Sequence, residues 1–301
     1  CDLVLLEVGM GGNLDATNII NNTLLAVLVS ISMDHMSFLG NTLSEIAEKK
    51  AGIIKEGSHV VTVRQKTEVM EVICEKCRSN HAECTVADAA QAQVVEEGVE
   101  GQTIIYEKEC YRIPLAGIYQ KENAVAALNA LKVLDGLGFP TTAEQKKEGL
   151  EKVSWNGRFT VLDTEPLFVV DGAHNPAAAD MLVQSIEHYF KGKRLIYIMG
   201  VFSDKDYQSV IRKTAPLADQ IFTIQTPNNV RALPAQKLAE AIEKINPHVE
   251  ATESVEAAVE KAYGLAEDKD VFLAFGSLSF IGIMTEAVEE EKKKRKEQQN
   301  D

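Results

Sequence analysis

The sequence predicts an α/β protein with two domains, each built around a mainly parallel sheet. Short apolar runs alternate with longer segments whose apolar residues recur at helical spacing, the order that parallel sheets with crossover helices require. Several apolar runs are followed at once by an acidic residue, a histidine or glycines, as at the carboxyl ends of parallel strands. A length of 301 residues with 45% hydrophobic content is enough for two cores.

The first half of the chain, residues 1–153, contains the elements of one such domain. The predicted strands are Leu3–Val8, Leu24–Ile31 and His59–Val63. The predicted helices are Leu43–Ile54, Thr67–Ser79 and Glu122–Leu137. Gln102–Tyr106 and Cys110–Leu115 are predicted to form an antiparallel hairpin, and a short helix ends near Val153.

Residues 154–158 are predicted to link this domain to a second one, residues 159–301. The predicted strands there are Leu167–Val170, Leu195–Met199, Gln220–Ile224 and Val271–Phe275. The predicted helices are Ala177–Tyr189, Tyr207–Ala215, Ala235–Ile245 and Val255–Leu265, with a last one from Phe280. This order indicates a Rossmann-like α/β domain, but no G-x-G-x-x-G supports dinucleotide binding.

Charge and composition exclude several classes of function. A net charge of −14 disfavours nucleic-acid binding, and the basic run Lys292–Lys296 lies beside Glu289–Glu291 as a solvated helix end would. No apolar run approaches the roughly 18 residues of a membrane span, so we expect no membrane association. Five cysteines, an odd number, suit a reducing compartment, and we expect a cytoplasmic protein.

The pair Cys74 and Cys77 has the C-x-x-C spacing of zinc and redox sites. It lies on a predicted helix, and no second C-x-x-C completes a set of four ligands. The sequence therefore favours ordinary thiols over a zinc or redox site.

Acidic and histidine side chains at predicted strand ends mark a first candidate site. Glu7 ends the first predicted strand before a glycine-rich bend, and Asp34 and His35 follow the second. Lys50 comes fifteen residues after the histidine, on the next helix. Carboxylate and imidazole at this edge suggest a hard divalent metal with phosphate nearby. The alternatives are solvated turn residues and, for Lys50, an exposed lysine on an amphipathic helix.

A second candidate site follows the predicted strand Leu167–Val170. The loop Asp171-Gly172-Ala173-His174-Asn175-Pro176 leads into a helix that Pro176 can begin. A helix start attracts anions through its free N–H groups, so this loop is suited to phosphate.

Together, these motifs resemble those of a known protein family. The chain resembles the folylpolyglutamate synthase/dihydrofolate synthase family of the Mur ligase superfamily, whose patterns E-V-G-x-G-G-x-x-D-A-T-N, D-H-x-x-x-L-G and K-A-G-I match Glu7–Asn18, Asp34–Gly40 and Lys50–Ile53. Later matches are Gly157–Phe159 to G-R-F, Asp171–Pro176 to D-G-A-H-N-P, and Gly276–Leu278 to G-S-L. The resemblance implies a central ATPase domain over 1–153 and a glutamate ligase domain over 159–301.

The resemblance also implies an activity: ATP-dependent ligation of L-glutamate to a folate or to dihydropteroate through an acyl phosphate. It implies ATP and Mg²⁺ as cofactors and a monomer whose partners are these small molecules. Glu7, His35 and, if carbamylated, Lys50 would be the catalytic metal ligands. The residues that would contact the nucleotide are Asn123, Arg158, Asp171 and His174.

The sequence departs from the family pattern at three places. It holds no G-x-x-x-x-G-K-[ST] phosphate loop, and it begins at Cys1 inside an apolar run, so we interpret it as an N-terminally truncated chain that does not hydrolyse ATP by itself. Asn13 stands where the family commonly has arginine, and Tyr119 replaces a histidine before Asn123. Two other interpretations stay open: another Mur-type amide ligase, and a non-catalytic homologue.

Overall fold

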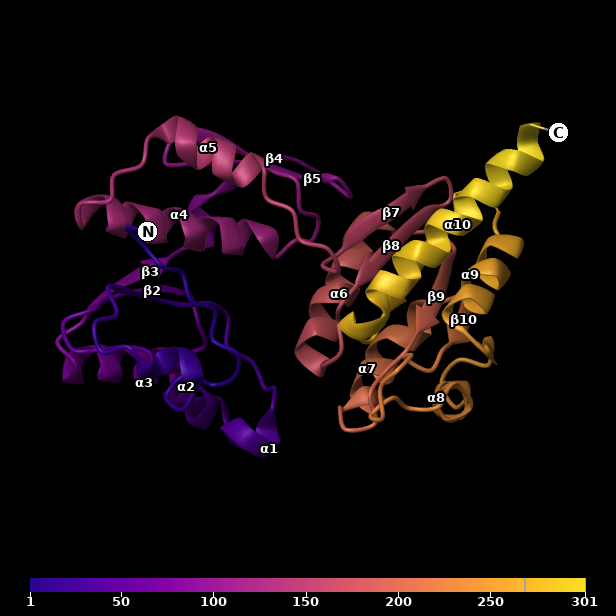
Figure 1. The fold of residues 1–301 in the computed structure, drawn as a ribbon, viewed down its shortest axis with the longest axis horizontal. Coiled ribbons are helices and arrows are strands. Elements are labelled where there is room, and N and C mark those ends of the chain that lie inside the picture. Colours follow the sequence, from indigo (N-terminus) through magenta and orange to yellow (C-terminus); the bar gives the residue numbers. More distant parts are fainter. Residues whose placement is uncertain (268, 301) are drawn as a thin grey trace. The chain divides into compact units, whose positions relative to one another are not determined.

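The computed structural model describes residues 1–267 and 269–300, with side chains at all of these except 37 and 298–300. The chain forms two compact units, and Figure 1 gives their elements. The first comprises residues 1–96, 102–114 and 119–153. The second comprises residues 154–301, to which the short segments 97–101 and 115–118 also belong. The predicted fold class, α/β with parallel sheets, is confirmed.

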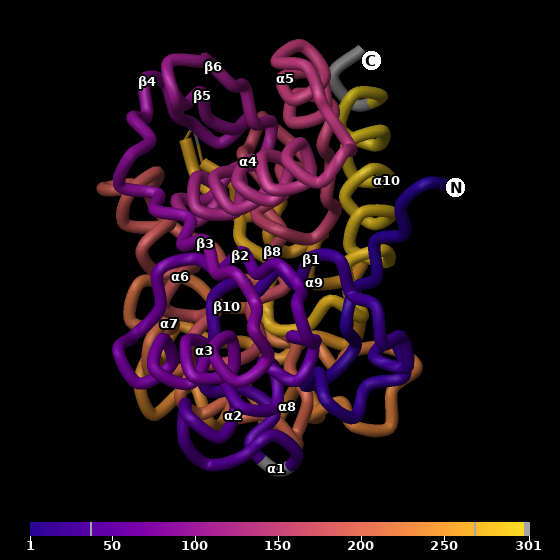
Figure 2. The backbone as a smooth tube through the Cα atoms, turned by 90° about the vertical axis from the view of Figure 1, so that its left-hand side faces the viewer, coloured from indigo at the N-terminus to yellow at the C-terminus, as the bar shows by residue number. Residues whose placement is uncertain are grey.

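The first unit is built on a three-stranded parallel sheet in the order β1-β2-β3. These strands are β1 (Leu25–Leu28), β2 (His59–Val63) and β3 (Glu83–Ala87). Helices α2 (Leu43–Ala51) and α3 (Thr67–Ser79) lie on one side of the sheet and α4 (Gln120–Gly136) on the other (Figure 1 and Figure 2). Short α1 (Met36–Leu39) precedes α2.

Helices α2 and α3 form where the sequence spaces its apolar residues by about one turn. Val69, Ile73 and Cys77 lie four residues apart on α3, and all three are buried in the core beneath the sheet. Thr42 caps α2 by accepting a hydrogen bond from the Glu45 amide at 3.2 Å. These helices and β2 agree closely with their predicted bounds.

A small sheet, most of whose residues belong to this unit, and a short helix complete it. The sheet has the order β4-β5-β6, with β4 (Gln93–Gly98), β5 (Gly101–Tyr106) and β6 (Glu109–Ile113). Helix α5 (Ala143–Glu151) begins with a capping box between Thr142 and Gln145. The predicted hairpin is confirmed as β5 and β6, whereas β3 and β4 were not predicted because their sequences lack a continuous apolar run.

The predicted strand Leu3–Val8 is wrong for the residues that the structure describes. Residues 1–8 pair with no described strand, and β1, the nearest in sequence, pairs only with β2. Val4 is 72% and Leu5 95% exposed. A strand persists only where its N–H and C=O groups find partners on a neighbour, and apolar composition alone does not supply that neighbour.

The second unit contains a six-stranded sheet in the order β11-β10-β9-β12-β8-β7. Its strands are β7 (Thr160–Thr164), β8 (Leu167–Asp171), β9 (Leu195–Met199), β10 (Gln220–Thr223), β11 (Val249–Ala251) and β12 (Val271–Phe275). All neighbours are parallel except β7, which pairs with β8 in antiparallel fashion. The edge strands β7 and β11 were not predicted, because both are short and half-polar.

Helices cover both faces of this sheet. Helices α6 (Pro176–Tyr189), α7 (Tyr207–Thr214) and α8 (Ala235–Glu243) share one apolar core with Val169, Tyr197 and Leu273. Helices α9 (Val255–Gly264) and α10 (Ile281–Asn300) share the other with Phe168 and Phe272. Adjacent residues of one buried strand thus point into different cores, which explains the continuous apolar runs of β8, β9 and β12.

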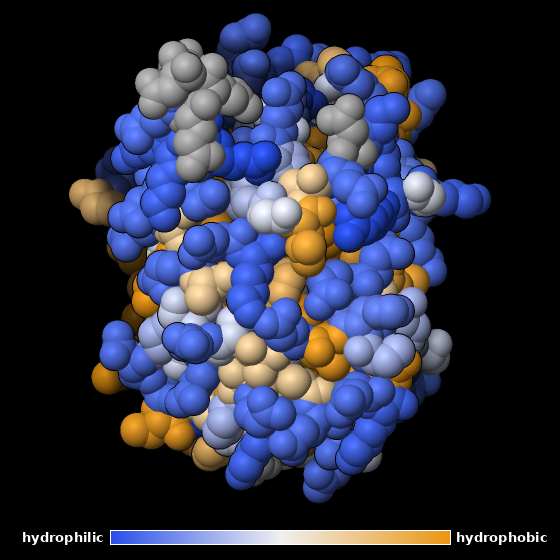
Figure 3. Space-filling model, turned by 90° about the vertical axis from the view of Figure 1, so that its right-hand side faces the viewer, coloured by the Kyte–Doolittle hydropathy of each residue, from blue (hydrophilic) through white to orange (hydrophobic). Residues whose placement is uncertain are grey.

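The surface in Figure 3 is predominantly hydrophilic, with smaller groups of hydrophobic side chains between the polar ones. Such a mixture is typical of a face in contact with water. Among the described helices, none has the length and apolar composition to cross a membrane.

Replacing either of two buried tyrosines of the second unit by phenylalanine should change the stability of the protein, in opposite directions for the two residues. The Tyr197 hydroxyl is buried and finds no hydrogen-bond partner among the described residues, so Tyr197→Phe should stabilise the protein by about 1 kcal/mol. The Tyr263 hydroxyl donates to Asp163 at 2.7 Å, so Tyr263→Phe should destabilise it by about 1–2 kcal/mol. Thermal unfolding of the two variants checks this. A change in melting temperature of the same sign in both variants would contradict this prediction.

Candidate active site

In the first unit, the structure brings together the three sequence motifs that were singled out near the N-terminus. A side chain on Gly12 would lie 2.6 Å from the Lys49 carbonyl oxygen and 2.8 Å from that of Lys50. One on Gly11, whose φ is +73°, would lie 3.0 Å from Leu39. Glycine is required here because the loop touches the end of α2 and the end of α1.

Hydrogen bonds hold the same loop on the C-terminal end of α2. The Asn13 amide donates to the Lys49 carbonyl oxygen at 3.0 Å, and the Asn18 side-chain amide donates to the Gly52 carbonyl oxygen at 3.2 Å. A side chain on Gly52 would lie 2.3 Å from the Asn13 Cβ. The glycines of the Glu7–Asn18 and Lys50–Ile53 motifs therefore make one docked junction.

Asp15 holds the shape of this loop. Its Oδ1 accepts from the Thr17 hydroxyl at 2.6 Å and the Thr17 amide at 2.9 Å, and its Oδ2 accepts from the Met10 amide at 2.9 Å. The hydrogen bond from the Thr17 hydroxyl and those from the two amides lower the pKa of Asp15 to about 2. The carboxylate is a structural anchor of the motif, a role that the sequence did not single out.

The pKa of Asp15 predicts how the loop responds to acid. Because the folded pKa of about 2 lies below the ordinary 3.8, the contribution of Asp15 to stability is present above pH 3.8 and is lost as the pH falls through 2. Thr17→Val removes the strongest donor, so the pKa of Asp15 should rise toward 3.8. Carboxyl chemical shifts in an NMR titration measure both values, and an unchanged pKa in the variant would contradict the assignment.

Glu7, His35 and Lys50 are not gathered into a metal site in the described part of the chain. Glu7 is exposed on the unpaired segment, and Lys50 is half-buried at the end of α2. His35 has a left-handed φ of +50°, and its Nε2 lies 3.8 Å from Asp34 Oδ2. No group of three or more His, Cys, Asp or Glu side chains among the described residues could hold a metal ion. The metal roles of the three residues stay predictions.

Asn123 occupies the first turn of α4. Its side-chain amide donates to the Gln120 Oε1 at 2.9 Å, and the residue is exposed. This contact agrees with the alternative role of a polar first-turn residue. Its predicted contact with nucleotide stays a prediction.

In the second unit, Asp171 ends β8 and organises the loop that follows. Its Oδ2 accepts from the Phe159 amide and its Oδ1 from the Ala173 amide, both at 2.8 Å. The side chain is buried, and burial raises the pKa of the Asp171 carboxyl, although the two amide donors and Arg158 offset part of that rise. Both oxygens are thus engaged by the backbone, and Asp171 positions the loop on which the other candidate residues lie.

Arg158 and His174 both lie next to Gly172. A side chain on Gly172 would lie 3.0 Å from Arg158 Nη1 and 2.4 Å from Leu278. The Nδ1 of His174 is 2.8 Å from the Gly172 carbonyl oxygen, which can only accept, so Nδ1 carries the proton in this contact. Arg158, Gly172 and His174 therefore form one cluster at the carboxyl end of β8.

This cluster lies at the start of α6, a helix of 14 residues. Asn175 caps the helix by accepting from the Ala178 amide at 2.8 Å, and Pro176 follows at the first position. A guanidinium, an imidazole and the positive end of a helix favour a bound anion. The second candidate site is thus a geometric unit, suited chemically to phosphate.

The late Gly276-Ser277-Leu278 motif packs beneath this loop. Leu278 contacts Gly157 and Gly172, and Gly276, at the end of β12, approaches the carbonyl of Gly200 at the end of β9. Because β12 lies between β8 and β9, these contacts bring three strand ends to one edge. Ligands of open α/β sheets bind at this edge.

Replacing Asp171 tests its positioning role. Asp171→Asn leaves one carboxamide nitrogen facing a backbone N–H donor, so we expect a loss of about 2 kcal/mol of stability. Asp180→Asn on α6 is the control: it breaks an exposed ion pair with Lys213 and should cost at most about 0.5 kcal/mol. Urea unfolding compares the two. Equal losses would contradict the role of Asp171.

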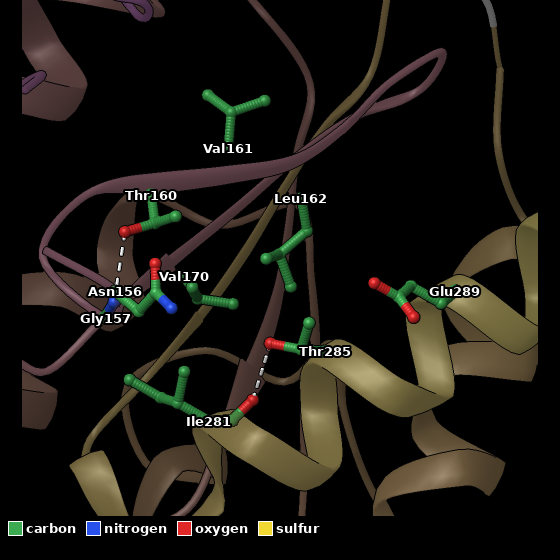
Figure 4. A pocket seen from close by; sticks show the side chains of 9 residues that line it. All are labelled: Asn156, Gly157, Thr160, Val161, Leu162, Val170, Ile281, Thr285 and Glu289. Carbon is green, nitrogen blue, oxygen red and sulfur yellow. Dashed lines mark hydrogen bonds between the residues drawn. The ribbon is translucent and has the colours of Figure 1, made fainter. Parts of the chain in front are cut away.

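A cavity of about 250 Å³ lies between the start of β7 and α10 (Figure 4). The Thr160 hydroxyl accepts from the Gly157 amide at 3.0 Å at one wall, and Thr285 donates to the Ile281 carbonyl oxygen at 2.9 Å at the other. Of the nine lining residues, Glu289 alone is charged, and its charge is negative. This cavity therefore does not suit phosphate, in contrast to the cluster at α6.

Comparisons with known proteins agree with this architecture. Residues 1–131 match the Mur ligase middle domain, and residues 157–278 match the Mur ligase, glutamate ligase domain. The fold and the two motif clusters thus define a Mur ligase. The chain belongs to the dihydrofolate synthase/folylpolyglutamate synthase family of these ligases.

Relatives and solved structures resemble the chain over most of its length. It is 32% identical to the dihydrofolate synthase/folylpolyglutamate synthase of Bacillus subtilis and 30% identical to that of Haemophilus influenzae, over 93% and 96% of the chain. It spans 66% and 68% of those two proteins. The Mycobacterium tuberculosis folylpolyglutamate synthase complexed with ADP aligns with a TM-score of 0.80 at 30% identity, covering 92% of this chain and 65% of that one.

Proposed function

We propose that this chain is part of an enzyme that uses ATP to ligate L-glutamate to a folate. A carboxylate of the folate attacks the γ-phosphorus of ATP, giving an acyl phosphate and ADP. The amine of glutamate then attacks the acyl carbon, forms the amide and releases phosphate. Both steps build up negative charge on phosphoryl oxygens, which the enzyme must neutralise.

The observation that carries this proposal is the cluster of Arg158, Gly172 and His174 at the start of α6. It offers a guanidinium, an imidazole and free helix N–H groups within a chain that is 30% identical to a synthase solved with ADP. We infer that Arg158 and His174 contact the nucleotide phosphates directly. Asp171 acts through them, because both of its oxygens accept backbone N–H groups.

The remaining roles follow from family membership. We propose that residues 1–153 form the ATP-binding and metal-binding domain and that residues 159–301 form the glutamate ligase domain. Mg²⁺ would be held by Glu7, His35 and, if carbamylated, Lys50, and would neutralise phosphate charge. Asn123 is proposed as a further nucleotide contact.

The test is an assay of the complete product of the gene with ATP, L-glutamate and either tetrahydrofolate or dihydropteroate. We expect ADP release that requires both glutamate and a pteridine acceptor, with a product heavier by one glutamyl residue. The acceptor that works separates folylpolyglutamate synthase from dihydrofolate synthase activity. Turnover only with a peptidoglycan precursor would indicate another Mur ligase, and absence of any turnover a non-catalytic homologue.

We also propose that the protein acts as a cytoplasmic monomer. Cys1, Cys74, Cys77, Cys84 and Cys110 are all free in the structure, as suits a reducing compartment. Size-exclusion chromatography with light scattering measures the oligomeric state, and a mass of twice the chain mass would contradict the monomer.

A further inference from the structure

Three of the five cysteines lie on two neighbouring elements of the first unit, α3 and β3. Cys74 and Cys77 are on α3, and Cys84 is on β3. Cys84 is in register with Val60 of β2, whose side chain belongs to the core beneath the sheet, together with Cys77. Because residues in register share one face of a sheet, the Cys84 side chain also points toward α3.

The connection between α3 and β3 holds Cys77 and Cys84 in place. The Ala82 amide donates to the Cys77 carbonyl oxygen at 2.9 Å, which closes the turn. The Asn80 side chain donates to the Ile54 carbonyl oxygen at 2.6 Å, and the Gly57 amide donates to the Asn80 carbonyl oxygen at 2.8 Å. The turn is therefore anchored to the loop after α2, and the two thiols are pre-positioned.

The Cys77 and Cys84 thiols differ in their exposure to solvent. Cys77 is 4% exposed, whereas Cys84 lies on the exposed edge strand β3. The two thiols are near enough for each to influence the pKa of the other. Burial raises the pKa of Cys77 to about 12, so this thiol stays protonated at neutral pH. Partial burial raises the pKa of Cys84 as well, but its greater exposure makes it the thiol that a reagent from solution can reach first.

We propose that Cys77 and Cys84 form a redox-active pair that a small-molecule disulfide oxidises to an intramolecular disulfide. The Cys84 thiolate attacks the small disulfide, forms a mixed disulfide and releases one small thiolate. The small thiolate released in this step takes the Cys77 proton. The Cys77 thiolate then attacks the Cys84 sulfur, and the second small thiolate leaves and is protonated by solvent. The protein loses two hydrogen atoms, and one small disulfide becomes two thiols.

The geometry separates this pair from the C-x-x-C pair that the sequence shows. Side chains at i and i+3 of a helix have Cβ atoms roughly 5–6 Å apart, whereas a disulfide needs about 3.5–4.5 Å. Cys74 and Cys77 are such a pair, in regular helix. A metal site is not indicated either, because no three His, Cys, Asp or Glu side chains in the described chain are placed to hold an ion.

Peptide mapping of the oxidised chain tests the proposal. The folded chain is treated with hydroxyethyl disulfide, free thiols are blocked, and trypsin is added. Cleavage after Lys66, Lys76, Arg78 and Lys108 puts each of the three cysteines in a separate peptide, residues 67–76, 77–78 and 79–108. We expect 77–78 joined to 79–108. Either of these peptides joined to 67–76, or mixed disulfides alone, would overturn the proposal.

Four variants, one of them a control, identify the roles of the thiols. Cys84→Ser should lower the yield of internal disulfide at least about tenfold, whereas Cys74→Ser and the exposed control Cys110→Ser should leave it unchanged. Cys77→Ala, which keeps the buried site apolar, should stop the reaction at a mixed disulfide on Cys84. Circular dichroism checks the fold of each variant. If Cys77→Ala fails to fold, the exposed Cys84→Ser variant still decides, since an unchanged yield there would overturn the proposal.

Discussion

Gly276→Ala is expected to destabilise the second unit by about 3–5 kcal/mol, from backbone strain and a close contact together. Gly276 has a φ of +113°, which L side chains rarely adopt, and an added Cβ would lie 2.4 Å from the Gly200 carbonyl oxygen. That oxygen belongs to the backbone, so it cannot move aside by changing rotamer. The substitution would therefore push apart the ends of β9 and β12.

Gly192→Ala is the matched control for this prediction. Gly192 also has a positive φ, +76°, but an added Cβ meets nothing within 4 Å. It should cost only the strain of the left-handed conformation, about 1–2 kcal/mol. Differential scanning calorimetry measures both variants. Equal losses would show that the approach of Gly276 to Gly200 contributes nothing.

Glu7→Gln is expected to lower ligation by the complete gene product by about a thousandfold or more, if Glu7 neutralises a cation at the transferring phosphate. The amide keeps the size of the side chain and removes its charge, which a hard cation needs. Glu7 is exposed on a segment that pairs with no described strand, so stability should change by no more than about 0.5 kcal/mol.

The control for Glu7 is Glu56→Gln, because Glu56 is exposed and pairs with His81 away from both candidate sites. Its ligation rate should equal that of the unchanged protein. Initial rates of ADP release measure both variants. Unchanged turnover in Glu7→Gln would refute the metal-binding role that the resemblance assigns to this residue.

Much of the fold was predictable because its signals are local. The bounds of β2, β9, β12 and α3 agree with those predicted, since each lies in an apolar run or a helical repeat ended by polar residues. The motif loops were also recognisable. Gly11 and Gly12 permit a close approach that the structure realises against Leu39 and the carbonyl groups of Lys49 and Lys50.

Whether the edge strands and the first apolar run form strands depends instead on neighbouring strands. Apolar composition and strand pairing do not coincide. Residues 3–8 are strongly apolar and unpaired, whereas Val249–Ala251 has only three residues yet pairs with β10. Strand formation requires a hydrogen-bonded partner, and no local pattern specifies one.

The sequence by itself determined the α/β class, the family and the residues Arg158, Asp171 and His174 as a candidate group, because these rest on periodicity and on motifs. Only the tertiary structure decided what those residues do to one another. It engages both Asp171 oxygens with backbone amides and places Arg158 beside Gly172. It also brings Cys84 of β3 to the face of the sheet on which Cys77 of α3 is buried. Contacts between distant segments follow from packing and sheet register, which no local spacing encodes.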